Sequence, residues 1–379
     1  MKTEKRPSLL IVSFSDIAND ARVKKQIALF ADQFRVTTCG RGSAIREDVE
    51  HIQLSAGSSR AREILQAGLL RVGFWRGAFA LEPEVRVARK LLKGRHFDVA
   101  ISNDLESVPV AAERVGYDRT VADLHEYWPG LHDQLSKWVT LRQPYFRWMI
   151  RKFVARTGAA ITVSAAIAER YREEFGISCQ VVHNATPKHN LQPGAVGEII
   201  RVVHSGGAQP NRKPEVMMRA VARSSASVTM DMYLTGQDTA YGKSLRELAA
   251  ELGERIRILP PKPYDELVET LNSYDVGVHI LPPTNTNNSL ALPNKLFDYV
   301  QARLALVVGP TEDMARRVKG FNLGAVADGF TEDDVVRVLD SLSPEKVREW
   351  KRASHVAAAV LNSESELPVL AAAVESVLE

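Results

Sequence analysis

The amino-acid sequence predicts an α/β protein made of two doubly wound domains, each built on a parallel sheet. Apolar, β-branched runs alternate with helix-like segments through nearly the whole chain, as in sheets that are covered on both faces. The chain has 379 residues, more than one hydrophobic core usually spans. The pattern restarts near Ile200, after a segment at 187–197 that contains Pro, Gly and polar residues. We therefore expect a first domain at 1–188 and a second at 196–360.

The expected strands are short, buried runs of the kind found in parallel sheets. In the first half they lie at 9–14, 36–39, 97–102, 120–124, 159–163 and 180–183. In the second half they lie at 200–204, 228–234, 256–259, 276–281, 304–308 and 324–327. Helical periodicity fills the gaps, for example at 21–31, 165–175, 216–223 and 245–252. Because ligands of such sheets bind beyond the carboxyl ends of the strands, the residues that follow each strand are the candidates for function.

Composition indicates a globular protein from a reducing compartment. The chain is 45% hydrophobic and 25% charged, and its 2 cysteines give no disulfide framework. The first apolar run, at 9–12, is too short for a signal peptide, and no run is long enough to span a membrane. We therefore expect a cytoplasmic protein. The sequence Gly40-x-Gly42 lacks a third glycine, so a dinucleotide fold of the dehydrogenase kind is not supported.

Charge is distributed unevenly between the two halves. Residues 1–190 contain 29 Lys and Arg against 21 Asp and Glu, a balance of +8, and the remainder contains 20 against 25, a balance of −5. A basic half suits an anionic membrane surface, a phosphorylated acceptor or nucleic acid. Chance drift of surface charge is the alternative.

Two aromatic and cationic stretches favour the membrane among these partners. Residues 137–156 hold six basic residues, no acidic residue and five aromatic residues, and residues 64–81 repeat the pattern with Arg71 and Arg76. Such a composition suits the interface of an anionic membrane, and a helix packed on the core with a solvated basic face is the alternative. We expect peripheral attachment to the inner face of the cell membrane, with no nucleic-acid partner.

Polar residues follow three strands of the first half. Asp20 is placed to cap the helix that begins at 21, and Arg22 can reach a ligand or be solvated. Asp104 follows the third strand and is also a capping candidate. His125 follows the fourth strand among polar and aromatic neighbours, where a histidine can exchange a proton near neutral pH. His183 and His204 lie inside strand-like runs, so we expect them in the core.

The second half contains a candidate diphosphate site. Gly206 and Gly207 follow a strand, and Arg212 and Lys213 precede the next helix, so backbone amides and cations are available to a phosphate. The sequence Pro293-Asn294-Lys295-Leu296-Phe297-Asp298-Tyr299 follows an Asn-rich run and predicts a helix start with Pro293 in its first turn. Lys295 and Asp298 share a face of that helix, which suits a diphosphate next to a ribose. A capped surface helix with an ion pair is the alternative.

Taken in order, these motifs resemble the family-4 glycosyltransferases, which have the GT-B fold. The likeness covers almost the whole chain. It rests on seven segments in the same order: 13–22, Asn103-Asp104-Leu105, Asp123-Leu124-His125-Glu126, Ile161-Thr162-Val163-Ser164, Val182-His183-Asn184-Ala185, the glycine and Arg212 segment, and 293–299. It implies two Rossmann-like domains facing across a cleft, the first for the acceptor and the second for the donor. It also implies that a last helix, at 365–379, packs back on the first domain.

The resemblance implies transfer of a sugar from a UDP- or GDP-sugar, with retention of the anomeric configuration. The acceptor is a glycan, a lipid-linked molecule or a small molecule. The implied catalytic residues are His125, Glu126 and Asp104. The implied acceptor-binding residues are Ser15, Asp20 and Arg22. The implied donor-binding residues are Gly206, Gly207, Arg212, Lys213, Ser289, Leu290, Asn294, Lys295 and Asp298.

The sequence departs from the family pattern at two donor positions. The first acid of the family's paired glutamates falls on Leu290, and Asp298 stands for the second. A further cation of the family falls on Gly206, and Lys295 can substitute for it. No convincing Asp-x-Asp metal pair follows a strand, so we expect no metal and assign its role to fixed cations and helix amides. The departures leave two alternatives, a catalytically weak nucleotide-sugar-binding partner protein and a nucleotide-sugar epimerase of the same fold.

Overall fold

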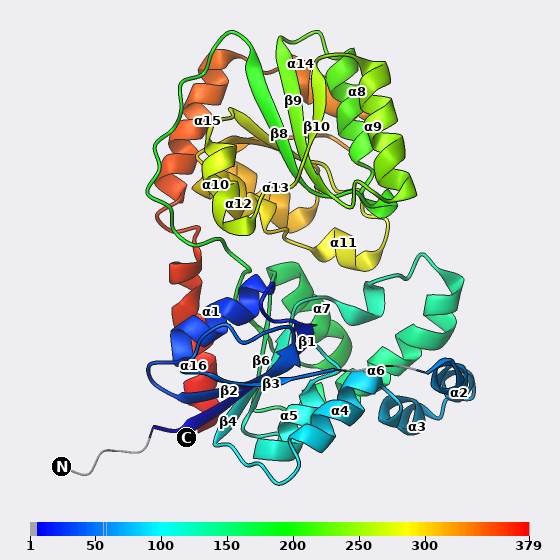
Figure 1. The fold of residues 1–379 in the computed structure, drawn as a ribbon. Helices are drawn as coiled ribbons and strands as arrows, with labels where there is room; N and C mark the ends of the chain where they lie inside the picture. The colour runs from blue at the N-terminus through cyan, green and yellow to red at the C-terminus, as the bar shows by residue number, and fades with distance from the viewer. Residues whose placement is uncertain (1–5, 56, 58, 379) are drawn as a thin grey trace, which may run out of the picture. The chain divides into compact units, whose positions relative to one another are not determined.

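The computed structural model describes residues 6–55, 57 and 59–378, which form two compact α/β units (Figure 1). The first unit comprises the chain up to His183, together with 285–287 and 367–379. The second unit comprises Asn184–Thr284 and Asn288–Glu366. The boundary at 183 and 184 lies five residues before the expected end of the first domain at 188.

The first unit is a parallel sheet with the strand order β3-β2-β1-β4-β5-β6-β7 within the described residues. Its strands are β1 (Ser8–Asp16), β2 (Arg35–Arg41), β3 (Glu50–Gln53), β4 (Val99–Asn103), β5 (Thr120–Leu124), β6 (Ala159–Thr162) and β7 (Gln180–Val181). Its helices are α1 (Ala21–Phe30), α2 (Arg60–Arg71), α3 (Trp75–Ala80), α4 (Pro83–Leu91), α5 (Val108–Val115), α6 (Gln143–Lys152) and α7 (Ala165–Phe175). Single helical turns lie at Trp128–Gly130, Trp138–Arg142 and Val154–Arg156.

The second unit repeats the design with the strand order β10-β9-β8-β11-β12-β13. Its strands are β8 (Ile200–Gly207), β9 (Val228–Thr235), β10 (Ile256–Leu259), β11 (Val276–His279), β12 (Ala305–Val308) and β13 (Gly324–Val326). Its helices are α8 (Pro214–Arg223), α9 (Ala240–Leu252), α10 (Tyr264–Asn272), α12 (Lys295–Gln301), α13 (Glu312–Gly320), α14 (Glu332–Asp340) and α15 (Pro344–Ala357). The short helix α11 (Thr286–Leu290) begins in the 285–287 segment of the first unit and ends in the second unit. A single turn at Pro210–Arg212 precedes α8.

Both faces of the second sheet are buried, and its strand β12, with the sequence Ala-Leu-Val-Val, is a continuous apolar run. Val202 of β8 and Val307 of β12 belong to one hydrophobic cluster, whereas their neighbours Val203 and Leu306 belong to the cluster on the opposite face. Successive side chains of a strand point to opposite faces, so a sheet covered by helices on both sides favours apolar residues at successive positions.

The last helix, α16 (Ser363–Leu378), completes the core of the first unit. Leu370, Ala373, Val374 and Val377 share one hydrophobic cluster with residues of β1, β4 and α1. These residues are spaced three or four apart, so they form one apolar face of the helix.

Two segments differ from the expected elements. The edge strand β3 has the sequence Glu-His-Ile-Gln, which carries no apolar run, and the sequence therefore did not indicate it. The stretch at 64–81 is two helices, α2 and α3, separated at Gly73, whose φ of 71° lies in the left-handed region that favours glycine.

Candidate functional site

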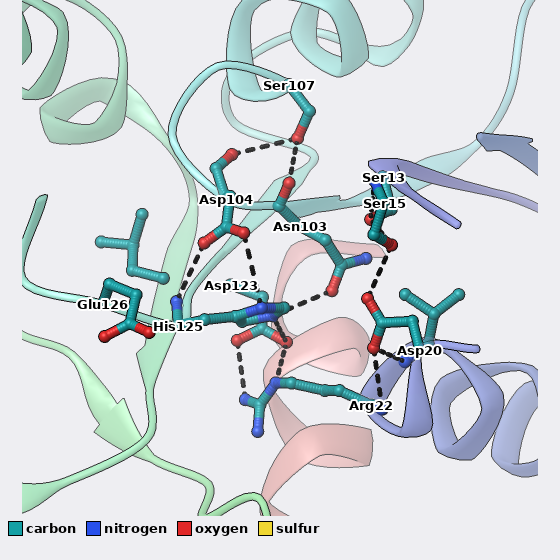
Figure 2. A network of polar contacts seen from close by, with 12 residues as sticks. Ser13, Ser15, Asp20, Arg22, Asn103, Asp104, Ser107, Asp123, His125 and Glu126 are labelled. Carbon is teal, nitrogen blue, oxygen red and sulfur yellow. Dashed lines mark hydrogen bonds and ion pairs between the residues drawn. The ribbon is translucent and has the colours of Figure 1, made fainter. Parts of the chain in front are cut away.

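In the first unit, the candidate residues gather at the carboxyl ends of three neighbouring strands. β1 lies between β2 and β4, and β4 pairs with β5, so the loops that follow β1, β4 and β5 meet at one edge of the sheet. The strand order reverses its direction of growth between β1 and β4, which is where ligands of doubly wound sheets bind. Figure 2 shows the side chains at this edge as one polar network.

A buried ion pair forms the base of this network. Arg22 donates through Nε and Nη2 to the two carboxylate oxygens of Asp123, both at 2.6 Å (Figure 2). Its Nη1 atom donates to the carbonyl of Val182 at 2.8 Å. Gln26, one helical turn after Arg22, donates to Asp123 at 2.8 Å and to Asn103 at 2.9 Å. Arg22 is 4% exposed, and these contacts give it the role of fixing Asp123. Contact between Arg22 and an acceptor stays a prediction.

His125 lies next to the Arg22–Asp123 ion pair. Its Nε2 atom is 3.2 Å from Oδ1 of Asn103 and 3.6 Å from Oδ2 of Asp123, and its Nδ1 atom is 3.5 Å from Oδ2 of Asp104 (Figure 2). The backbone amide of His125 also donates to Asp104 at 3.3 Å. Asp104 has a φ of 66°, an uncommon conformation for a residue with a side chain, and its amide donates to the carbonyl of Asp123 at 2.8 Å. Both ring nitrogens of His125 therefore face carboxylates.

The charges of the cluster follow from these contacts. Burial by itself would lower the pKa of His125, but the carboxylates of Asp104 and Asp123 raise it to about 9. Burial would raise the pKa of Asp123, but Arg22 and His125 lower it to about 2. At neutral pH the imidazole is therefore a cation, which donates hydrogen bonds and does not accept a proton.

Ser15 and Asp20 lie together in the loop after β1. The hydroxyl of Ser15 is 2.8 Å from that of Ser13 and donates to Asp20 at 2.7 Å. The other carboxylate oxygen of Asp20 accepts from the amides of Arg22 and Val23, which confirms the expected helix cap. Glu126 follows His125 in sequence, and its backbone carbonyl accepts from the hydroxyl of Tyr171 at 2.9 Å.

In the second unit, Lys295 reaches the glycine at the end of β8. A β-carbon built on Gly206 would lie 3.2 Å from Cε and 3.6 Å from Nζ of Lys295, and 3.1 Å from Nε2 of His204. A side chain at this position would therefore press on Lys295 and His204, and glycine leaves the backbone open. Lys295 makes no hydrogen bond or ion pair with any residue that the structure describes. Burial and the nearby charge of Arg212 lower its pKa to about 8, and Asp298 opposes this effect.

Arg212 and Lys213 occupy the turn between β8 and α8. Arg212 donates from Nε to Oε1 of Gln209 at 3.1 Å. Lys213 precedes the first turn of α8 with a φ of 45°, in the left-handed region. Gly207 is the last residue of β8 and is paired with Thr235 of β9. The glycines thus end β8 and the cations lie on the turn that follows it. The charge of Arg212 also lowers the pKa of Lys295.

Two stacked histidines that the sequence analysis did not assign to the site lie next to Lys295. The rings of His204 and His279 lie 5.8 Å apart and within 5° of parallel, and Nδ1 of His204 is 2.8 Å from the carbonyl of Val278. Burial and Lys295 lower the pKa of His204 to about 3, so the stack is neutral there. The expectation of a core position is confirmed for His204, which is 5% exposed, and is wrong for His183, which is half-buried beyond the end of β7. The sequence signal was a histidine near the end of each of two buried strands.

Asp298 lies in the first turn of α12 and is 4% exposed. It accepts a hydrogen bond of 2.5 Å from the hydroxyl of Thr186, a residue of the segment before β8. The helix begins at Lys295 and is preceded by Asn294 in the capping position, so the expectation that Pro293 lies in the first turn is wrong. The carbonyl of Pro293 instead accepts from the amide of Leu296 at 3.1 Å.

Ser289 and Leu290 end the short helix α11, five residues before α12 begins. Both are half-buried. They precede the donor-site residues in sequence, and a role for them in donor binding stays a prediction.

Two further features concern ligands and membranes. Within the described ranges, no three His, Cys, Asp or Glu side chains are grouped so that they could hold a metal ion. In the same part of the chain, no helix is long and apolar enough to cross a bilayer.

The chain has two α/β units, each with a parallel sheet and polar residues at its strand ends. Its last helix joins the core of the first unit. This arrangement defines the GT-B class of fold. Comparison with known proteins supports this class. Residues 32–188 match the family model described as Glycosyltransferase Family 4, which confirms the resemblance over that stretch. No curated protein sequence matches the chain.

Solved structures match over nearly the whole chain. Sucrose-phosphate synthase from Thermosynechococcus elongatus has 13% identity and a TM-score of 0.72, with 97% of this chain and 98% of that chain covered. HepE from Anabaena, in complex with UDP-glucose, has 13% identity and a TM-score of 0.72, with coverage of 98% and 100%. An α,α-trehalose-phosphate synthase (UDP-forming) from Burkholderia vietnamiensis has 12% identity and a TM-score of 0.67, with coverage of 97% and 100%. At these identities the likeness establishes the fold.

Proposed function

We propose that the protein is a glycosyltransferase that moves a sugar from a UDP-sugar to a glycan, a lipid-linked molecule or a small-molecule acceptor. The observation that carries the proposal is Lys295, a half-buried cation without an ion-pair partner among the described residues, next to the bare backbone of Gly206. Desolvation of an unpaired cation is unfavourable, and a diphosphate supplies the missing charge. HepE, which has the same fold, is seen with UDP-glucose, and this favours a UDP-sugar as the donor.

Lys295 and Arg212 are assigned the role of stabilising the diphosphate as it leaves. Negative charge grows on the diphosphate as the bond to the sugar breaks, and fixed cations in a partly dry site stabilise it. One well-placed donor of this kind contributes about 3 kcal/mol to the transition state. We assign the phosphates to Gly206, Gly207, Arg212 and Lys295, and the ribose to Asp298. Because these two cations supply the positive charge, we propose a mechanism that needs no metal ion.

His125 is proposed to act on the sugar or the acceptor as a hydrogen-bond donor. The carboxylates of Asp104 and Asp123 keep it protonated, so a role as general base is disfavoured at neutral pH. The side chain of Asp104 is 37% exposed, whereas that of Asp123 is fully buried, so Asp104 is the carboxylate that an acceptor hydroxyl can reach. Ser15, Asp20 and Glu126 complete the proposed acceptor side, and we propose retention of the anomeric configuration.

Incubation with labelled UDP- and GDP-sugars, with and without candidate acceptors, tests the proposal. Release of UDP that depends on an acceptor, together with a labelled glycoside as product, is the expected result. Conversion of the donor to its epimer without an acceptor would identify an epimerase instead. Donor binding without turnover for any acceptor would identify a nucleotide-sugar-binding partner, the reading that Leu290 in place of an acid favours.

We further propose that the first unit attaches to the inner face of the cell membrane, where a cell-envelope glycan or its lipid-linked precursor is the acceptor. Four apolar side chains on α2 and the turn before α3 support this: Ile64, Leu65, Val72 and Phe74 are 65%, 53%, 76% and 58% exposed. Arg71 and Arg76 lie among them. Apolar side chains interleaved with arginines suit the interface of an anionic bilayer, where each cation contributes about 1 kcal/mol.

Co-sedimentation with vesicles tests the attachment. We expect binding to phosphatidylglycerol vesicles at low salt, weaker binding to phosphatidylcholine vesicles, and release as salt screens the charges. Changing Ile64 and Phe74 to Ser should weaken binding. The matched control changes Val356 and Val360 of the second unit, which are 73% and 53% exposed, to Ser. Equal loss in both variants, or no binding by the wild type at low salt, would contradict the proposal.

A further inference from the structure

The first unit contains a cavity between α3 and α6 that the proposed donor and acceptor residues do not use. Its volume is about 440 Å³, and it is lined by Trp75, Pro144, Arg147, Trp148, Arg151 and Lys152. Trp75 begins α3, and the other lining residues belong to α6. Figure 1 shows α2, α3 and α6 grouped on one side of this unit.

The walls of the cavity are aromatic and held in place. The rings of Trp75 and Trp148 lie 6.1 Å apart. Trp148 also packs against Tyr145 at 6.0 Å and Phe153 at 5.3 Å, and Phe153 packs against Phe79 of α3 at 5.4 Å. These contacts join the two helices, so the walls are formed before a ligand binds, which lowers the entropic cost of binding.

Two cations at the cavity have no carboxylate partner among the residues that the structure describes. Arg147 is paired with Glu174, and so its charge is already offset. Arg151 lies 5.3 Å from the centre of the Phe175 ring, a cation–π contact that leaves its charge in place. Neither Arg151 nor Lys152 makes an ion pair with a residue that the structure describes. The cavity is therefore suited to an anionic group.

The lining offers donors and apolar surface but no side-chain acceptor. Tryptophan, arginine and lysine donate hydrogen bonds only, and proline has no polar side-chain atom. A sugar would find donors for its hydroxyl oxygens here but no side-chain acceptor for its hydroxyl protons. Val72 and Phe74, which precede Trp75 in sequence, are apolar side chains that are 76% and 58% exposed. An apolar chain fits such a surface, with an anionic head at Arg151 and Lys152.

We propose that this cavity binds a lipid phosphate, with the apolar chain against Trp75 and Trp148 and the phosphate at Arg151 and Lys152. In the catalytic cycle the ligand is the phosphorylated lipid that carries the acceptor glycan. This second statement rests on the proposed function, whereas the binding itself does not.

Titration of the full-length protein with farnesyl phosphate, below the concentration at which it forms micelles, tests the proposal. Trp75 and Trp148 line the cavity, so their fluorescence reports binding directly. We expect saturable binding of farnesyl phosphate, weaker binding of farnesol and no binding of inorganic phosphate. The double variant Arg151→Gln, Lys152→Gln should lose affinity by about tenfold or more, as expected for loss of a charge-assisted contact. Trp148→Leu should also weaken binding.

The matched control removes the same charge from α4 of the same unit, with Arg86→Gln and Lys90→Gln. Both residues are exposed and lie outside the cavity. Equal loss of affinity in the two double variants would show a diffuse charge effect and overturn the proposal. Binding to phosphatidylglycerol vesicles without binding to farnesyl phosphate would overturn it as well. If farnesyl phosphate binds and depends on Arg151 and Lys152, but no sugar is transferred, the cavity stands and the proposed function fails.

Discussion

At the scale of single residues, the first unit holds a buried ion pair whose partners lie 101 positions apart in sequence. Arg22 and Asp123 are 4% and 0% exposed, and the guanidinium meets both carboxylate oxygens. Such a pair adds little to stability compared with apolar residues of similar volume in the same place. Removal of one partner, however, leaves an unpaired charge in the interior. The pair also fixes the carboxylate that holds the His125 imidazole in its charged form.

Arg22→Gln should therefore destabilise the first unit strongly. The expected loss is about 3–5 kcal/mol in the free energy of unfolding, measured by urea titration. Arg46→Gln, which removes an exposed pair with Asp48, is the control and should have little effect on the free energy of unfolding. The double variant Arg22→Gln, Asp123→Asn should recover part of the loss, because no charge is then left unpaired. Equal effects of Arg22→Gln and Arg46→Gln would contradict the burial of the pair.

His125 should make stability depend on pH. The pKa of His125 in the folded protein is about 9, above its usual value of about 6.5. Its contribution to the free energy of unfolding is therefore present in full below pH 6.5 and is lost as pH rises through 9. The contribution is no more than about 3 kcal/mol. Urea unfolding at pH 6, 7.5 and 9.5 should show a smaller decline with pH for His125→Asn than for the wild type. An equal decline in the free energy of unfolding for both proteins would show that a group other than His125 causes the pH dependence.

Lys295 should bind the donor diphosphate only while it is charged. Lys295→Ala should weaken binding of UDP about tenfold to hundredfold, as expected for loss of a charge-assisted contact. Its pKa of about 8 predicts that the affinity of the wild type for UDP falls between pH 7 and 9. Calorimetry should show a flatter profile for Lys295→Arg, which stays charged. Lys262→Ala, at an exposed position of the same unit, is the control. Unchanged UDP affinity in Lys295→Ala would show that the diphosphate does not bind at Lys295.

At the scale of elements, α16 is part of the core of the first unit although it lies at the end of the chain. Leu370 and Val374 are 3% and 0% exposed and pack with residues of β1 and α1. Leu370→Ala should lower the free energy of unfolding by about 2–5 kcal/mol, because it leaves a cavity. Glu375→Ala, on the exposed side of the same helix, should have little effect. UDP affinity should not change in either variant. Full stability of Leu370→Ala would show that α16 packs elsewhere.

At the scale of the whole molecule, the division into two units predicts that a nucleotide stabilises one of them. UDP at a hundredfold excess over its Kd should stabilise the second unit by about 2.7 kcal/mol. Hydrogen exchange should therefore slow in β8 and α12, whereas β1 and β4 should exchange at their former rates. Protection confined to the first unit would reverse the assignment of donor and acceptor domains.

The sequence by itself predicted most elements of both sheets and the strand-end position of the candidate residues. Strands that are buried on both faces are rich in apolar residues, and the cap at Asp20 depends on a side chain and amides two and three residues apart. These signals are local, so one sequence contains them. The polar edge strand β3 lacks such a signal because it is held by pairing with β2.

Only the tertiary structure decided how the candidate residues act. Arg22, predicted to meet an acceptor, is held by Asp123 and Val182, and the charge of His125 depends on carboxylates from two strands. Trp75 and Trp148, 73 positions apart, form one cavity wall only because α3 and α6 pack together. Charge state and cavity shape depend on distances between segments remote in sequence, and packing of the folded chain sets those distances.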